Sequence, residues 1–231
     1  MKVCVIGCER SGTSAVSRLL SVGSGYSLLD DPPESWYSYP VIYWQGHGLS
    51  LKLWWKLRKY HIVKVPGFAT ILPYLKKRFV GNFTALYCIR DPRDVVASVI
   101  ERLEQGGYSP LFTDVTWLGI HVADRVEAIS WRWRKYLECA LHYRRDGGKV
   151  VFIKYEDFCH DRLGALLKCT EKLSIRFNSS KVRPFLETQF GKNWDKTIQG
   201  AGRWQSDLDE FDVQKTTGIC GDLMRRWGYD Y

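Results

Sequence analysis

Two short stretches of the sequence combine glycines, hydroxyls and arginines in a pattern that can bind an anion. The first, residues 7–14, reads GCERSGTS and lies between the apolar run VCVI and the run AVSRLL. In such a strand–loop–helix turn, backbone N–H groups and the positive end of the helix converge on an anion. Arg10 would add a fixed charge, and Ser11, Thr13 and Ser14 would add hydroxyls. The glycine spacing is that of a nucleotide-triphosphate loop, but Thr13 stands where such a loop has its lysine.

The second stretch is ALYCIRDPRDVVASVI, residues 85–100. Arg90 falls where a predicted strand ends, Pro92 suits the first turn of a helix, and Ser98 follows eight residues after Arg90. In an open parallel sheet, ligands bind outside the carboxyl ends of the strands, which is where both Arg10 and Arg90 fall. The two stretches therefore predict two anion sites on one ligand. Alternatively, the charges of RDPRD could pair with one another at the helix start.

The elements that must position these residues alternate between strands and helices, as in a parallel sheet covered by helices. Four short, mostly apolar, β-rich runs suit buried parallel strands. They are Lys2–Ile6, His61–Val65, Phe83–Ile89 and Val150–Tyr155. The prediction is a three-layer α/β fold, with a mostly parallel central sheet of about four or five strands flanked by helices. We expect one domain over residues 1–231.

Two helices are predicted from apolar spacing in the second half of the chain. The first carries apolar residues at intervals of three or four over residues 122–141 and stops at Gly147-Gly148. The second begins at Ser206, with Asp209 three residues later in a capping-box-like pattern, and ends at Gly228. Residues 24–60 are less regular and are expected to form loops.

Composition limits the classes of partner and the compartment. The chain has 34 Lys and Arg against 25 Asp and Glu, and its formal charge of +9 favours an anionic partner. Seven cysteines without CxxC or Cys/His ligand spacing argue against a disulfide framework and structural zinc, so we expect reduced thiols in the cytoplasm. The opening MKVCVIG is too short to be a signal peptide, and no apolar stretch approaches a membrane span of roughly 20 residues.

Five segments together resemble the sulfotransferase family. GCERSGTS resembles its 5′-phosphosulfate loop and IRDPRDVVAS resembles its 3′-phosphate motif, with the Arg-to-Ser spacing of eight intact. VFIKYEDF resembles the family's strand ending in Tyr-Glu-Asp, and GAGRWQSDL and ICGDLMRRWGY resemble its C-terminal segment. The resemblance implies a P-loop-like fold and a donor, 3′-phosphoadenosine 5′-phosphosulfate (PAPS), that leaves adenosine 3′,5′-bisphosphate (PAP).

The resemblance also implies roles for individual residues at the nucleotide. Arg90 and Ser98 would bind the 3′-phosphate, Tyr155 would lie near the adenine, and Arg203 in GAGRW would approach the nucleotide. The residues that would surround the 5′-phosphosulfate are Arg10, Ser11, Gly12, Thr13 and Ser14. No metal is expected, because a sulfonate carries less charge than the terminal phosphate that Mg²⁺ neutralises in phosphoryl transfer.

For catalysis, the resemblance implies that Arg10 stabilises charge on the bridging oxygen and that Lys64, in HIVKVPGF, contacts the sulfonate. Pro66 stands where cytosolic relatives have a catalytic histidine, so the usual base is missing. Some relatives use a glutamate from the segment after the first helix, here LLDDPPESWY, and Glu34 is the predicted base. The alternatives are Asp30, Asp31, His61 and Glu9.

The acceptor is expected to offer a hydroxyl or amine on a small molecule, glycan or lipid. By resemblance, a group of aromatic residues forms part of the opening of the acceptor-binding site: Trp36, Tyr37, Tyr39, Tyr43, Trp44, Trp54 and Trp55. Two other classes of function are weighed against this one. A P-loop kinase or other nucleotide-binding protein would explain the glycine spacing. A non-enzymatic protein could bind nucleic acid or membrane through the run WWKLRKYH, although no nucleic-acid motif accompanies it.

Overall fold

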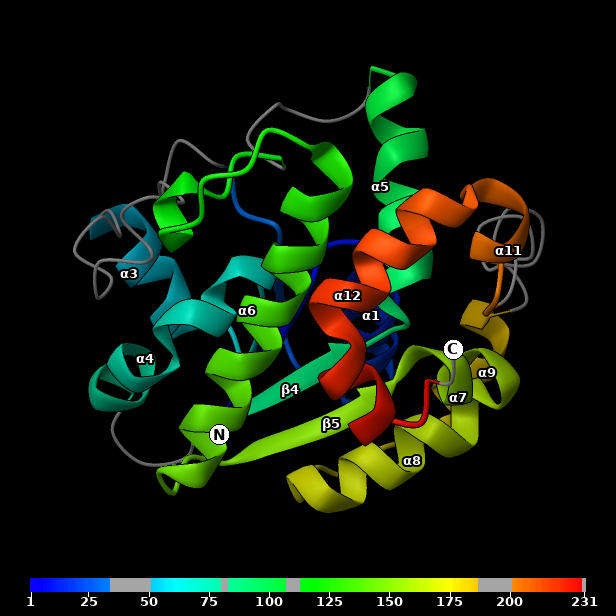
Figure 1. Cartoon of the computed structure of the whole chain (residues 1–231). Helices are drawn as coiled ribbons and strands as arrows, with labels where there is room; N and C mark the ends of the chain where they lie inside the picture. Colours follow the sequence, from blue (N-terminus) through cyan, green and yellow to red (C-terminus); the bar gives the residue numbers. More distant parts are fainter. Residues whose placement is uncertain (34–50, 80–82, 107–112, 187–200, 230–231) are drawn as a thin grey trace.

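Five parallel strands form the centre of the computed structural model, which describes residues 1–33, 51–79, 83–106, 113–186 and 201–229 (Figure 1). The strand order is β2-β3-β1-β4-β5, and every neighbouring pair is parallel. The strands are β1 (Lys2–Gly7), β2 (Leu28–Asp30), β3 (Ile62–Lys64), β4 (Phe83–Ile89) and β5 (Val150–Lys154). The predicted α/β fold with a parallel sheet is confirmed. That residues 1–231 form one domain stays a prediction.

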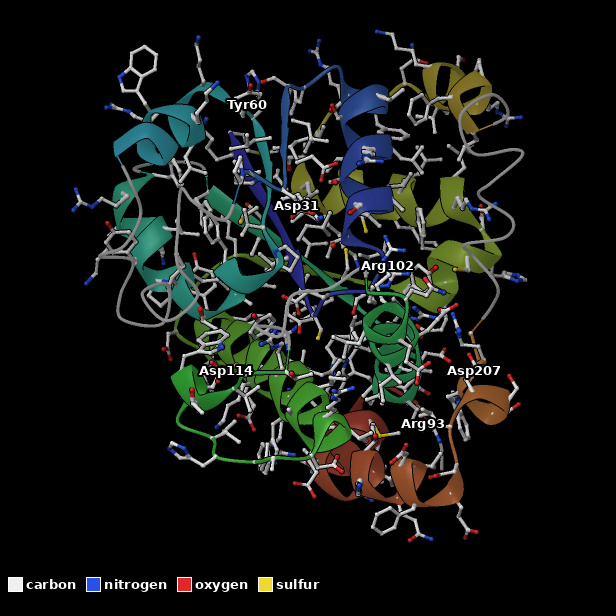
Figure 2. All side chains as sticks on the ribbon, turned by 90° about the horizontal axis from the view of Figure 1, so that it is seen from above. Asp31, Tyr60, Arg93, Arg102, Asp114 and Asp207 are labelled. Carbon is white, nitrogen blue, oxygen red and sulfur yellow. The ribbon has the colours of Figure 1, made fainter. Side chains whose placement is uncertain are left out.

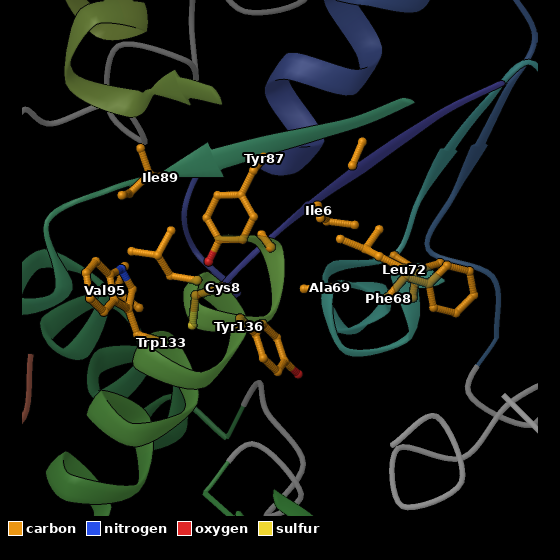
Figure 3. Packing of buried hydrophobic residues seen from close by; sticks show 14 of the residues in the cluster. Ile6, Cys8, Phe68, Ala69, Leu72, Tyr87, Ile89, Val95, Trp133 and Tyr136 are labelled. Carbon is orange, nitrogen blue, oxygen red and sulfur yellow. The ribbon is translucent and has the colours of Figure 1, made fainter. Parts of the chain in front are cut away.

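Side chains of β1 alternate between two apolar cores, one on each face of the sheet. Val3 and Val5 pack with α1 (Thr13–Ser24) and α8 (Arg162–Leu173). Cys4 and Ile6 face the core that contains Tyr87, Trp133 and Tyr136 (Figure 3). That second core is covered by α6 (Arg125–Arg145), α12 (Glu210–Arg226) and the 3₁₀ turn at Pro66–Ile71. Helices thus cover both faces, which gives three layers (Figure 1).

The helix predicted over residues 122–141 is α6. Asp124 caps its start by accepting a 3.0 Å hydrogen bond from the Glu127 N–H, and Gly147, with φ of 76°, follows its end. The prediction for the last helix was wrong at its start. Ser206 lies in the short α11 (Trp204–Asp207), and α12 begins only after Asp209, whose carboxylate caps the Asp212 N–H at 2.8 Å. The extended backbone at Leu208 separates the two helices.

Residues 24–60 contain more regular structure than the loops expected from sequence. They include β2, only three residues long, and α3 (Leu51–Lys59). A three-residue strand is too short to show a periodic pattern, and its position depends on pairing with β3, where Leu28 lies opposite Ile62. The other α-helices in the described residues are α4 (Leu72–Arg78), α5 (Pro92–Glu104), α7 (Tyr155–His160) and α9 (Ser179–Phe185). Among the described helices, none has the length and apolar character needed to cross a bilayer.

Candidate functional site

Residues 7–14, here called the glycine loop, leave the carboxyl end of β1 in a conformation that needs its two glycines. Gly7 and Gly12 have φ of 148° and 80°, which side-chain-bearing residues rarely adopt. A Cβ on Gly7 would come within 2.4 Å of the Cys88 carbonyl oxygen, and one on Gly12 within 2.4 Å of the Tyr155 ring. The loop therefore packs directly against β4 and against the start of α7. Arg10 also has a positive φ, 67°, so the turn holds a non-glycine residue in a strained conformation.

The helix that follows the glycine loop has an uncompensated positive end. No side chain caps α1 after Gly12, and its first turn contains no Asp or Glu. The Ser11 hydroxyl is almost completely buried, and within the described part of the chain it has no hydrogen-bond partner. Buried polar groups are nearly always paired, so an orphaned hydroxyl beside a free helix start indicates a ligand position. The loop can therefore hold an anion, as the sequence predicts.

Arg90 reaches the glycine loop from the end of the adjacent strand β4. Its Nη1 donates a 2.9 Å hydrogen bond to the Arg10 carbonyl oxygen, and its guanidinium carbon lies 4.6 Å from the centre of the Tyr155 ring. Its Nε is buried, and no partner for it occurs among the residues placed in the structure. Arg10 Nε in turn donates to the Ser98 hydroxyl at 2.9 Å. Arg10, Arg90, Ser98 and Tyr155 thus form one group, the arginine cluster, although they come from four different segments.

The alternative that the charges of RDPRD pair with one another holds for part of this motif. Arg93 makes two hydrogen bonds to the Asp91 carboxylate, at 2.7 and 3.0 Å, and both side chains are buried. Arg90, by contrast, lies 3.9 Å from the Asp94 carboxylate and directs its hydrogen bond to the loop. The motif therefore divides into a structural pair at the start of α5 and one arginine that faces the glycine loop.

Asp94 attaches the GAGRW segment to α5. Its two carboxylate oxygens accept hydrogen bonds from the Gly202 and Trp204 N–H groups, at 2.9 and 3.0 Å. Burial raises the pKa of Asp94, although these hydrogen bonds and Arg90 oppose the shift. Arg203 lies in this segment but pairs with Glu101 at 3.0 Å and with Asp207. The structure therefore brings Arg203 to α5, where its charge is balanced by two carboxylates, rather than into the arginine cluster.

Glu156 links the β4–α5 turn, next to the arginine cluster, to the C-terminal Tyr229. It was not among the site residues predicted from the sequence. It accepts hydrogen bonds from the Asp91 N–H and from the Tyr229 hydroxyl, both at 2.9 Å. Burial raises the pKa of this carboxyl group above its usual range. The residue stands in the quoted YEDF segment, next to Tyr155. The only sequence signal was its place in that motif, because its partners come from the β4–α5 turn and the C-terminus.

Lys64 forms a second charged group at the end of β3, which we call the lysine–aspartate cluster. Its ammonium group is buried, contacts the Asp31 carboxylate and lies 3.6 Å from Asp30. Asp30 also pairs with Arg18 of α1 at 2.8 Å. Asp31 is half exposed and has a positive φ of 39° (Figure 2). Because β3 lies directly beside β1, with Lys64 opposite Val5, this cluster is next to the glycine loop.

The structure places the described candidates for the catalytic base in different parts of the molecule. The predicted base, Glu34, lies outside the described residues. The His61 alternative was wrong: it required β3 to run in the other direction, but β3 is parallel to β1, so His61 lies at the amino edge of the sheet. There its Nδ1 is 2.9 Å from the Ser27 hydroxyl. Glu9 is turned toward α6, where its Oε2 lies 3.9 Å from Arg132. Asp31 contacts the Lys64 ammonium at the carboxyl end of β3.

The aromatic residues predicted at the acceptor mouth are mostly outside the described part of the chain. Those at positions 36, 37, 39, 43 and 44 lie outside it, as does the side chain of Trp54. Trp55 is described, and it stands on α3 beside Arg58 and Lys59. The helix leads into the amino end of β3, whereas the glycine loop follows the carboxyl end of β1. Trp55 therefore does not line the same edge of the sheet as the loop.

No group of three or more His, Cys, Asp or Glu side chains in the described residues is arranged to hold a metal ion. All seven cysteines belong to the described part, and all are free thiols. Five of them, Cys4, Cys8, Cys88, Cys169 and Cys220, are buried, and burial raises the pKa of each thiol. A protonated buried thiol is a poor nucleophile and a poor metal ligand.

Comparisons of the sequence and of the fold with known proteins both find sulfotransferases. The profile of the family described as "Sulfotransferase domain" matches residues 1–228. No curated protein matches the chain by sequence. Among solved structures, a mouse sulfotransferase complexed with PAP superposes with a TM-score of 0.65 at 14% identity, covering 97% of this chain and 84% of its own.

Two further structures agree in fold. The sulfotransferase domain from the curacin biosynthetic pathway has a TM-score of 0.58 at 16% identity and covers 96% of both chains. A retinol dehydratase in complex with androsterone and the inactive cofactor PAP has a TM-score of 0.53 at 17% identity, with 97% of this chain and 80% of that chain covered. At such low identities, these likenesses establish the fold alone.

Proposed function

The chain belongs to the sulfotransferase domain family, and from this membership we propose the reaction that it catalyses. It transfers the sulfuryl group of PAPS to a hydroxyl or amine on a small-molecule, glycan or lipid acceptor, and PAP is the nucleotide product. The observation that carries the proposal is the glycine loop, where the orphaned Ser11 hydroxyl lies beside a helix start without a cap. The cytoplasmic location expected from the cysteines belongs to the same proposal.

The residues present fit a nucleotide with two anionic ends. Ser11 Oγ and Arg90 Nε are buried donors without partners among the described residues, and each can donate a hydrogen bond to a phosphate or sulfonate oxygen. They belong to the glycine loop and the arginine cluster, which touch through the Arg90 to Arg10 hydrogen bond. We assign the 5′-phosphosulfate to Arg10, Ser11, Gly12, Thr13 and Ser14, and the 3′-phosphate to Arg90 and Ser98. Tyr155, which packs on Gly12 and Arg90, would lie near the adenine.

Arg10 would act by charge rather than by proton donation. A guanidinium group stays protonated in proteins, so its contribution to transfer is electrostatic stabilisation of the leaving oxygen. In the described structure its Nε is bound to Ser98, so a phosphate that engages Ser98 would compete with this contact. Lys64 is proposed as a second positive group near the sulfonate. Its contact with Asp31 balances its charge when no anion is present.

The acceptor must lose a proton as the sulfuryl group arrives, and a carboxylate is the proposed base. Glu34 remains the first choice, because glutamate has a longer side chain than the aspartates at positions 30 and 31 in the same segment. Asp31 is the second choice because it is half exposed and lies against Lys64.

The direct test is transfer of label from PAPS carrying ³⁵S. We expect labelled product in an acceptor screen of phenols, alcohols, amines and sugars, and we expect the rate to be unchanged in EDTA. The physical reason is that positioning and fixed positive charge suffice for a sulfonate, which bears less charge than a terminal phosphate. ATP turnover with a strict Mg²⁺ requirement, and no transfer of ³⁵S, would favour the kinase alternative instead.

The 3′-phosphate assignment predicts how the nucleotide binds. PAP should raise the melting temperature of the protein, whereas adenosine 5′-phosphate, which lacks the 3′-phosphate, should raise it much less. Arg90→Ala should weaken PAP binding by roughly 1.5–3 kcal/mol, the scale of a charge-assisted hydrogen bond. Arg102→Ala is the matched control, because Arg102 is an exposed arginine on α5 (Figure 2). Equal affinity for the two nucleotides would rule the assignment out.

A further inference from the structure

The positive charge of this protein is concentrated in one part of the sequence. No Asp or Glu occurs between Glu34 and Asp91. The stretch carries Lys52, Lys56, Arg58, Lys59, Lys64, Lys76, Lys77, Arg78 and Arg90. These nine positive charges equal the whole net charge of +9, so the rest of the chain is balanced. A segment with one sign of charge produces a local field that a balanced surface lacks.

The structure gathers most of these charges on one flank of the molecule. Figures 1 and 2 both place α3 and α4 on the same side of the molecule. Five basic side chains of these two helices are exposed: Arg58, Lys59, Lys76, Lys77 and Arg78. We call this surface the basic flank. Its charge comes from two helices that are separate in the chain, so the surface forms only when the fold brings them together.

A surface hollow of about 470 Å³ lies on the basic flank. It is lined by Met1, Lys2, Arg58, Lys59, His61, Arg78 and Phe79. None of these described lining residues is a carboxylate, so a bound anion would meet no negative side chain among them. An anionic group the size of a lipid phosphate can therefore enter the hollow and remain among cations.

Lys2 lines the hollow, but its ammonium group is bound to α3. Its ammonium donates hydrogen bonds to the carbonyl oxygens of Leu57 and Arg58, at 2.8 and 2.6 Å. These carbonyls belong to the last turn of α3, where a positive charge stabilises the negative end of the helix dipole. The contact attaches α3 to the start of β1. It leaves Arg58, Lys59 and Arg78 as the exposed cations around the hollow.

Trp55 stands next to these cations with 71% of its surface exposed. The Lys59 ammonium lies 5.7 Å from the centre of its ring, and Trp55, Arg58 and Lys59 together line a second hollow of about 280 Å³. A large exposed indole is costly in water, but it is favoured at a membrane interface, where its apolar body and polar N–H are both accommodated. A basic helix with aromatic and aliphatic residues fits the same environment.

We propose that the basic flank docks the protein on an anionic lipid surface. The Trp55 indole enters the interface, and the cations around the hollow bind lipid phosphates. The attraction of several Lys and Arg side chains to a negative leaflet is additive near the surface, which suits a flank without acids. The exposed indole suits the interface of a bilayer. Nucleic acid is the less favoured partner, because the sequence has no nucleic-acid motif to accompany the charge.

Docking in this way would leave the glycine loop accessible. The hollow borders Lys2 at the start of β1 and His61 just before β3, that is, the amino edge of the sheet. The loop follows the carboxyl end of the same strand β1. The bilayer and the loop would therefore lie at opposite edges of the sheet. This inference does not depend on the reaction proposed above.

The test is co-sedimentation of the full chain with vesicles of phosphatidylcholine, with and without phosphatidylserine. We expect binding to the anionic vesicles only, and loss of binding at high salt because the attraction is screened. Arg58→Glu/Lys59→Glu should weaken binding at least about tenfold. Lys168→Glu/Lys172→Glu is the matched control: both lysines are exposed on α8, on the other side of the molecule, and the net charge changes equally (Figure 1).

A second measurement locates the indole. Brominated anionic lipid should quench part of the tryptophan fluorescence of the wild-type protein, and Trp55→Ala should lose that part. Three results would overturn the proposal: equal binding to neutral vesicles, equal weakening by the two double variants, or tighter binding to duplex DNA than to anionic vesicles at the same salt. Unchanged quenching in Trp55→Ala would overturn it too.

Discussion

Arg10→Ala is expected to slow sulfuryl transfer by about 10²-fold or more, while weakening PAP binding much less. Negative charge on the leaving oxygen develops mainly in the transition state, so a cation aimed at that oxygen affects the rate more than it affects affinity for the product. The measurement is turnover at saturating PAPS, with PAP affinity determined separately by calorimetry. Arg10→Lys keeps a positive charge and should recover part of the lost rate.

The Arg10 variants need a control for the backbone. Arg10 has φ of 67°, and alanine and lysine at this position carry the same conformational strain. Their melting temperatures should therefore agree with each other, which leaves charge as the difference in rate. Equal losses of rate and PAP affinity would show that Arg10 binds the nucleotide uniformly and would contradict the electrostatic role.

Glu34→Gln is expected to depress turnover by about 10²-fold or more, with nucleotide binding unchanged. Glutamine has nearly the same shape but cannot accept the acceptor's proton, so the loss would report proton transfer. The pH profile adds a second readout. Wild-type turnover should rise as the carboxylate ionises and then level off, and the variant should lack that rise.

The comparison with Asp31→Asn decides between the two carboxylates. Asp31 contacts Lys64, so its replacement removes the balancing charge from a buried ammonium and should lower the melting temperature. Glu34→Gln is expected to leave the melting temperature unchanged. Near-normal turnover in Glu34→Gln, together with a large loss in Asp31→Asn, would transfer the role of base to Asp31.

The strand–loop–helix turn at residues 7–14 was predictable because all of its determinants are neighbours in the chain. An apolar run, two glycines and a helix-forming run follow one another, and each acts on the backbone within a few residues. The same holds for Arg90 at the end of β4 and for Pro92 at the start of α5. Parallel strand order then placed both arginines at one edge of the sheet, as expected.

The predictions that were wrong or incomplete concern features that depend on contacts with distant parts of the chain. The strand at His61–Val65 was predicted to be parallel, but its neighbour in the sheet was not predicted, and its pairing with β1 decided that His61 lies at the amino edge. Strand β2 has only three residues, and the start of α12 depends on whether Ser206 or Asp209 caps it. Local patterns leave such choices open, since packing and hydrogen bonding to distant segments decide them.

By itself, the sequence determined the family, the layered α/β fold and the residue types that can meet an anion, because these follow from local patterns and motif spacing. Only the tertiary structure decided which of those residues touch. Arg10 meets Ser98 at 2.9 Å, Glu156 holds the Asp91 N–H, and Arg203 pairs with acids on and near α5. Most of these contacts join residues far apart in the chain, which the packing of the helices and the common edge of the parallel strands bring together.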